Sequence, residues 1–167
     1  MNFRVVKLED FSGVQATIYS VILEEDEHNG TTLFDHFVTE NIKEHHEEVK
    51  DIASRLKAIG NKTGARDNFF KDWEGQPGDG VCALFDNPDK HLRLYCIRFG
   101  KGVLVVGGGG HKPKAMKAFQ ESEKLTQEND YMRIVSHEIE KKIRAKDITF
   151  APDGTELFGD FKFYDHE

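Results

Sequence analysis

Basic side chains gather at the end of a predicted strand, where His111, Lys112 and Lys114 follow the four glycines at 107–110. Because an imidazole titrates nearest to neutral pH, His111 is the candidate general acid or base. Lysines beside it could stabilise the negative charge of a phosphorane. Such a set suits RNA cleavage by attack of a 2′-hydroxyl on the neighbouring phosphate. The alternative is a solvated basic loop that ends the strand.

The strand before it, Leu92 to Phe99, carries the second part of this candidate site. Period-two alternation places Arg93 and Tyr95 on one face of the sheet. On a solvated face, Tyr95 could stack on an RNA base while Arg93 contacts phosphate, and Arg98 and Lys101 would add RNA-binding cations. We expect the four glycines to act as a hinge that presents His111 and Lys112 beside this face. An ordinary, partly solvated sheet face is the alternative.

Two other kinds of site fit the sequence less well. The four glycines could approach a nucleotide phosphate, but a dinucleotide fingerprint would need a third glycine where Lys112 stands. His45-His46 with Glu47-Glu48, and His137-Glu138, lack the i, i+4 histidine pair of a helical zinc motif. The sequence therefore predicts neither a cofactor nor a metal site. Nucleotide binding at the glycines stays open as an alternative.

The composition predicts one folded domain over residues 1–167. The chain has 38% hydrophobic residues and a net charge of −7, which argues against non-specific nucleic-acid binding. A local basic patch remains, because residues 88–118 carry seven lysines and arginines against one aspartate. Cys82 and Cys96 lack a metal or redox spacing. Without a leader-like or bilayer-spanning segment, we expect a cytoplasmic protein that does not enter a membrane.

Hydrophobic periodicity and turn residues predict an α+β fold. Strands are expected at 3–8, 14–23, 81–85, 92–99 and 103–106. Helices are expected from Thr31 or Thr32 to about residue 42, over 49–59, and after Pro113, with a break near Asn129. Pro152-Asp153-Gly154 predicts a hairpin within 147–164. We expect an antiparallel sheet packed on a helical hairpin, with all helices on one side, and a C-terminal helical segment and hairpin as additions.

The order of these elements resembles the RelE/ParE/HigB toxin superfamily over roughly residues 33–120. The resemblance rests on the segments Phe70-Lys71-Asp72-Trp73-Glu74-Gly75, Leu92-Arg93-Leu94-Tyr95 and Val103-Leu104-Val105-Val106-Gly107, followed by a basic turn and a helix. It implies a small antiparallel sheet on a helical hairpin. It also implies that Arg93 is the family's strand arginine and that His111-Lys112 stand where HigB-like members carry paired lysines.

The functional expectation that the resemblance implies is a toxin of a toxin–antitoxin pair. Such a protein would be a metal-independent, ribosome-associated mRNA endonuclease with an antitoxin protein as partner. His111, Lys112 and Arg93 would be catalytic, and Tyr95, Arg98, Lys101 and Lys114 would bind RNA. The alternative is a non-catalytic domain that keeps the fold and binds another protein through its phenylalanine-rich surfaces or its C-terminal hairpin.

Overall fold

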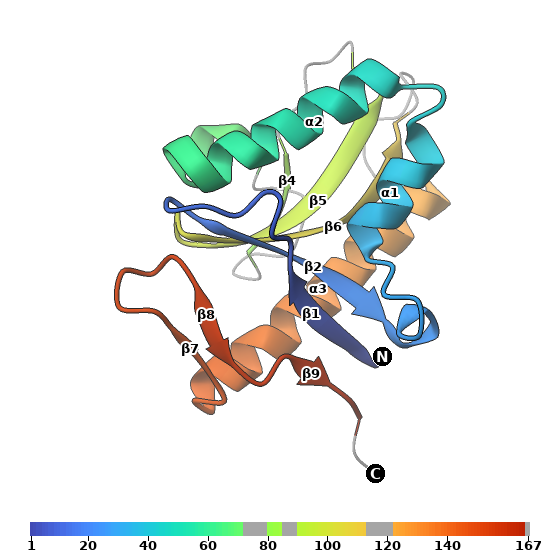
Figure 1. Cartoon of the computed structure of the whole chain (residues 1–167). Helices are drawn as coiled ribbons and strands as arrows, with labels where there is room; N and C mark the ends of the chain where they lie inside the picture. Colours follow the sequence, from blue (N-terminus) through green and yellow to red (C-terminus); the bar gives the residue numbers. More distant parts are fainter. Residues whose placement is uncertain (72–79, 85–89, 113–121, 166–167) are drawn as a thin grey trace.

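A seven-stranded sheet lies between helices on both of its faces (Figure 1). The computed structural model describes residues 1–71, 80–84, 90–112 and 122–165. The strands of the main sheet are β1 (Phe3–Lys7), β2 (Thr17–Leu23), β3 (Phe70–Lys71), β4 (Val81–Leu84), β5 (Leu92–Phe99), β6 (Val103–His111) and β9 (Lys162–Phe163). The α-helices are α1 (Leu33–Asn41), α2 (His46–Ala58) and α3 (Glu123–Arg144). Three single turns of 3-10 or π helix occupy Glu24–Asp26, Ile59–Thr63 and Asp67–Phe69. The expected α+β class is confirmed.

The strand order is β3-β4-β5-β6-β2-β1-β9, and its pairs are antiparallel except for one. β2 and β6 run parallel, with Thr17 opposite Val103 and Ser20 opposite Val106. The expectation of a purely antiparallel sheet is therefore wrong at this pair. The parallel pair follows from the path of the chain. After β2 the chain passes through α1 and α2 on one face, and β6 enters the centre of the sheet beside β2 only after β4 and β5.

Helices α1 and α2 cover one face of the sheet, as the two amphipathic patterns predict. Thr32 caps α1 through a capping box, since its hydroxyl accepts from the Asp35 N–H at 2.9 Å and the Asp35 carboxylate accepts from the Thr32 N–H at 3.0 Å. Phe34, Phe37 and Leu56 are among the side chains that pack here against Leu92, Leu94 and other residues of the sheet. This face forms one of two buried apolar layers.

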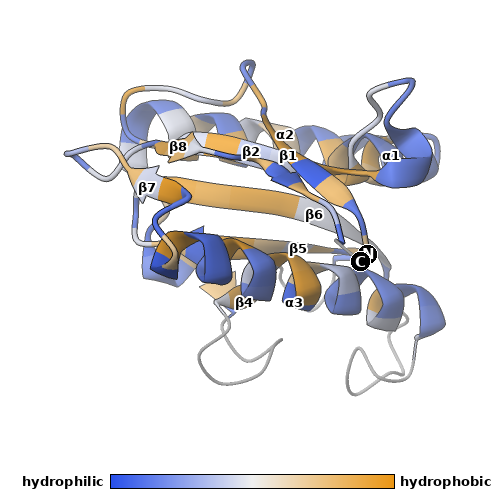
Figure 2. Ribbon diagram, turned by 90° about the horizontal axis from the view of Figure 1, so that it is seen from below, coloured by the Kyte–Doolittle hydropathy of each residue, from blue (hydrophilic) through white to orange (hydrophobic). Residues whose placement is uncertain are grey.

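Helix α3 covers the opposite face, so the expectation that all helices lie on one side is wrong. Figure 2 shows the sheet between α3 and the pair α1 and α2, with apolar residues of α3 turned toward the strands. Met132, Val135 and Ile139 of α3 belong to a second apolar layer. The break expected near Asn129 is also wrong, because α3 continues through this residue, whose side chain is fully buried.

The four glycines lie inside β6 and not in a hinge. A Cβ built on Gly107 would stand 2.3 Å from Sδ of Met132, and one on Gly108 would stand 2.7 Å from Oε2 of Glu128. Helix α3 therefore lies too close to β6 for side chains at these positions. The segment predicted to be a hinge is part of the strand β6, and α3 packs on its backbone at Gly107 and Gly108.

A β-bulge in this glycine segment decides which face His111 occupies. Leu94 pairs with Gly109 and Cys96 with Val106, so two residues of β6 stand opposite the single residue Tyr95. The extra residue shifts the alternation of β6 by one position. His111 consequently pairs with Leu92 and directs its ring to the α2 side of the sheet, where it lies beside His45.

The C-terminal segment forms the expected hairpin and then returns to the main sheet. β7 (Ile148–Phe150) and β8 (Leu157–Gly159) pair antiparallel as a separate two-stranded sheet. β9 then pairs with β1, and the rings of Phe3 and Phe163 stack with centroids 4.6 Å apart. Within the described residues, no helix is long and apolar enough to span a bilayer.

We predict that Gly109→Ala destabilises the protein by about 2–3 kcal/mol, since its Cβ would lie 1.8 Å from the backbone oxygen of Arg93, and a backbone atom cannot move aside cheaply. Gly110→Ala is the matched control, because its Cβ meets side chains and no backbone: Cγ of the flexible Lys124 at 3.1 Å and, at an ordinary contact distance of 3.7 Å, Cδ2 of Leu125. We expect the control to stay within about 1 kcal/mol of wild type. Urea unfolding measures both variants, and equal losses would contradict the close approach of the Arg93 backbone to Gly109.

Candidate functional site

Three histidines and one glutamate meet where β5 begins and β6 ends. We call His45, His91, His111 and Glu48 the histidine cluster. The ring centroids lie 4.9 Å apart for His45 and His91, 5.3 Å for His45 and His111, and 5.8 Å for His91 and His111. His45 is the N-cap residue of α2, Glu48 lies in the first turn of α2, His91 precedes β5, and His111 ends β6. Three separate segments thus deliver the titratable groups to one place.

Glu48 joins the N-terminus of α2 to the start of β5. Its Oε1 accepts from the backbone N–H of His91 at 2.7 Å and lies 3.0 Å from Nδ1 of the same residue, while its Oε2 accepts from the Leu92 N–H at 3.0 Å. Burial acts to raise the pKa of the carboxyl, but the hydrogen bonds from His91 and Leu92 outweigh it and lower the pKa below its ordinary value. The carboxylate is therefore ionised at neutral pH.

The Glu48 carboxylate also sets the tautomer of His91. An ionised carboxylate only accepts hydrogen bonds, so the Nδ1 of His91 that faces it carries a proton. In the neutral imidazole the lone pair then lies on Nε2. The His91 side chain is 45% exposed, so this ring is partly open to solvent while one edge is held by the protein.

His45 brings a buried nitrogen to the cluster. Its Nε2 is inaccessible to solvent and has no hydrogen-bond partner among the residues that the structure describes. Leaving a buried polar atom without a partner costs about 1–3 kcal/mol. This nitrogen is thus an available donor atom for a ligand.

Lysines accompany each histidine of the cluster in the sequence. Lys43 precedes His45 by two positions, Lys90 directly precedes His91, and Lys112 directly follows His111. Lys112 extends the strand pairing, because its backbone N–H donates to the His91 carbonyl oxygen at 2.8 Å. Glutamates also adjoin His45 in the sequence, at positions 44, 47 and 48, so charges of both signs lie close to the histidines along the chain.

The structure does not bring Arg93 and Tyr95 to the side of the sheet on which His111 lies. Alternation along β5 directs both side chains toward α3, where Tyr95 is fully buried and Arg93 is 8% exposed. The solvated face expected here is a second core layer, because α3 covers it. Neither side chain is placed to contact a base or phosphate beside the cluster while α3 stays on this face.

The other expected RNA-binding residues lie elsewhere. Arg98 stands five residues along β5 from Arg93, roughly 16 Å away at the usual strand rise. One nitrogen of its guanidinium donates to the Ala65 carbonyl oxygen at 2.8 Å and to Asp67 at 2.5 Å. Lys101 belongs to the turn between β5 and β6, at the same distant end. Lys114 lies outside the described residues.

Sequence reasoning found His111 and Lys112 but missed His91, His45 and Glu48 as members of one site. Pairing β5 with β6 from their turn at Gly100 would have placed His91 near His111 without any structure. No comparable signal links α2 to β5, because Glu48 and His91 are 43 positions apart in the sequence. The expectation of no metal site rests on two short segments, 45–48 and 137–138, and neither of them includes His91.

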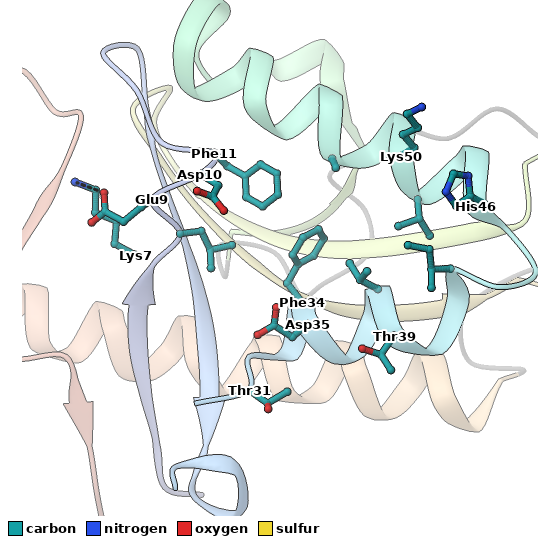
Figure 3. A pocket seen from close by; sticks show the side chains of 15 residues that line it. Lys7, Glu9, Asp10, Phe11, Thr31, Phe34, Asp35, Thr39, His46 and Lys50 are labelled. Atoms are coloured by element: carbon teal, nitrogen blue, oxygen red, sulfur yellow. Dashed lines mark ion pairs between the residues drawn. The ribbon is translucent and has the colours of Figure 1, made fainter. Parts of the chain in front are cut away.

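An apolar groove lies between α1, α2 and the segment that follows β1 (Figure 3). Its volume is about 910 Å³. Phe11 and Phe34 meet edge to face in it, with ring centroids 5.7 Å apart, and Val38, Ile42 and Val49 continue the lining. Its chemistry differs from that of the cluster, since it offers mainly apolar surface.

Comparison with protein-family models, with curated proteins and with solved structures found no match to this chain. The function must therefore be argued from the chain's own residues.

We predict that Glu48→Gln lowers the free energy of unfolding at pH 7 by about 1–3 kcal/mol, because it removes charge-assisted hydrogen bonds to β5. The pKa of Glu48 is lower in the folded protein than in the unfolded chain. The contribution of this carboxylate to the free energy of unfolding is therefore complete above the unfolded pKa of about 4.5. That contribution fades as the pH falls through the lower, folded pKa. The difference between variant and wild type should consequently shrink in acid.

Chemical denaturation at pH 7 and at pH 3 measures this effect. Glu47→Gln is the control, because the neighbouring side chain is 89% exposed and its contact with His46 is worth little. A Glu48→Gln protein as stable as the Glu47→Gln protein at pH 7 would show that the carboxylate does not hold β5 to α2.

Proposed function

We propose that the protein is an RNA-cleaving enzyme whose active site is the histidine cluster. The observation that carries the proposal is the convergence of His91 and His111, two imidazoles open to solvent whose ring centroids lie 5.8 Å apart, one of them oriented by a carboxylate. Paired imidazoles can supply a general base and a general acid near neutral pH. Lysines beside each histidine add the positive charge that a polyanionic substrate requires.

His91 acts as the base in the proposed reaction. Its Nε2 accepts the proton of the ribose 2′-hydroxyl, and the 2′-oxygen forms a bond to the adjacent phosphorus. The bond from phosphorus to the 5′-oxygen breaks, and protonated His111 donates a proton to that leaving oxygen. Lys112 stabilises the charge of the phosphorane. The products are a 2′,3′-cyclic phosphate and a 5′-hydroxyl, and no metal takes part in these steps.

The resemblance to the toxin superfamily supplies the biological setting of the proposal. Two helices on one face, followed by the antiparallel strands β4, β5 and β6, agree with the order that the resemblance implies. On this basis the protein would be the toxin of a toxin–antitoxin pair that cleaves ribosome-bound mRNA. Its antitoxin would find apolar surface in the groove between α1 and α2.

We predict that His91→Ala and His111→Ala each lower the rate of mRNA cleavage at least about 100-fold, the usual effect of losing an acid or base. Purified protein is incubated with translating ribosomes, and mRNA cleavage is followed by primer extension. His137→Ala is the control, since this histidine lies exposed on α3. Intact mRNA with wild-type protein, or equal losses in all three variants, would refute the proposal.

The groove favours a second candidate function, a non-catalytic domain that binds a partner protein. In that case Val38→Glu, which puts a charge among the apolar groove residues, should weaken binding of the partner protein at least about tenfold. Ile134→Glu on α3 is the matched control, because it places the same charge on an exposed apolar position of the opposite face. Calorimetric titration measures both variants, and equal affinities would exclude the groove as the binding surface.

A further inference from the structure

Three side chains of the histidine cluster have the composition and spacing of a metal site. His45, Glu48 and His91 each offer one ligand atom, and these atoms all lie within 4.8 Å of one another. We propose that they bind a divalent transition metal ion of the zinc class, a property separate from RNA cleavage. Two imidazole nitrogens and one carboxylate oxygen form the ligand set of many zinc sites that keep a fourth position open.

The ligand types decide which metals the site would take. Imidazole nitrogen favours Zn²⁺, Co²⁺, Ni²⁺ and Cu²⁺, whereas Mg²⁺ and Ca²⁺ prefer sets made of oxygen alone. The site offers two nitrogens against one carboxylate. We therefore expect Zn²⁺ to bind and Mg²⁺ not to compete with it.

The buried nitrogen of His45 is independent support for a ligand here. This Nε2 is inaccessible to solvent and has no hydrogen-bond partner among the described residues, and the centroid of its ring lies 4.9 Å from that of His91 and 5.3 Å from that of His111. A metal ion would give it a partner.

The protein already holds the ligands in the way that metal sites require. Backbone N–H groups of His91 and Leu92 fix the Glu48 carboxylate, and such contacts behind a ligand orient it toward the ion. His45 and Glu48 are both held by the start of α2, and His91 is held by the start of β5. Little backbone would therefore have to be ordered on binding.

Binding would require only small movements of side chains. Ligand atoms about 2.0–2.2 Å from a tetrahedral zinc ion are about 3.4 Å apart. Atoms now up to 4.8 Å apart would therefore approach by about 1.4 Å. The rings of His45 and His91, whose planes differ by 23°, would turn about their side-chain bonds so that one nitrogen of each ring faces the ion.

The inference does not rest on the proposed RNA cleavage, since binding is measured without RNA. One molecule cannot use His91 as the general base and as a zinc ligand at the same time. A His91 that ligates zinc has no free lone pair opposite the carboxylate, so it cannot accept a proton there. Failure of one proposal thus leaves the other standing.

The test titrates Zn²⁺ into tag-free, chelator-treated protein by calorimetry and follows Co²⁺ binding by absorption. We expect one equivalent of Zn²⁺ to bind, a rise in melting temperature, and the intense visible bands of tetrahedral Co²⁺. His45→Ala and His91→Ala should each weaken binding at least about tenfold, whereas His137→Ala should leave it unchanged. Mg²⁺ in large excess should not displace the ion.

The outcome that would overturn the inference is wild-type protein that binds Zn²⁺ no more tightly than the His45→Ala/His91→Ala double variant. An equal loss in His137→Ala would overturn it as well, because binding would then be a property of scattered surface histidines. Circular dichroism establishes that each variant is folded. Since the Co²⁺ spectrum and the melting shift use the wild type, a variant that fails to fold does not prevent the test.

Discussion

Close packing of α3 on the glycine segment of β6 is the contact on which the rest of the structure depends. β6 joins β3, β4 and β5 to β2 and β1, and buried apolar layers cover both of its faces. Each glycine in a strand loses more conformational entropy on folding than a residue with a side chain, roughly 0.5–1 kcal/mol relative to alanine. Burial of Met132, Val135 and Ile139 against the sheet offsets this cost. The helix can approach only because the strand offers bare backbone.

The same segment positions the candidate site. Glycines accept the irregular geometry of the bulge opposite Tyr95, and the extra residue turns His111 toward α2. Without that residue, alternation would direct the His111 ring toward α3, away from His45 and His91. In the sequence the four glycines resemble a phosphate-binding loop. In the fold they allow α3 to pack on one face of β6, and the bulge among them directs His111 to the opposite face, on which α2 lies.

Much of the fold could be predicted because it is locally encoded. The capping residue Thr32, the turn at Pro152-Asp153-Gly154 and the periodicity of each helix all lie within the element they specify. The side of the sheet that α3 covers could not be predicted in this way. Arg93 and Tyr95 gave β5 a mixed polar face, and polar atoms on a strand do not reveal whether a distant helix buries them. The parallel pairing of β2 with β6 likewise depends on a crossover and not on a turn.

The site was predictable to the extent that a hairpin carries it. His111 and His91 are neighbours because β5 and β6 share a short turn, so their proximity follows from counting residues. Glu48 and His45 reach the same place through the packing of α2 on the sheet, which no local pattern encodes. Glu48 is what changes the chemistry of the group, because its ionised oxygens hold His91 in one tautomer and add an anionic ligand. The same carboxylate binds both the backbone N–H and the Nδ1 of His91, so α2 and β5 are joined at the point where the imidazoles meet.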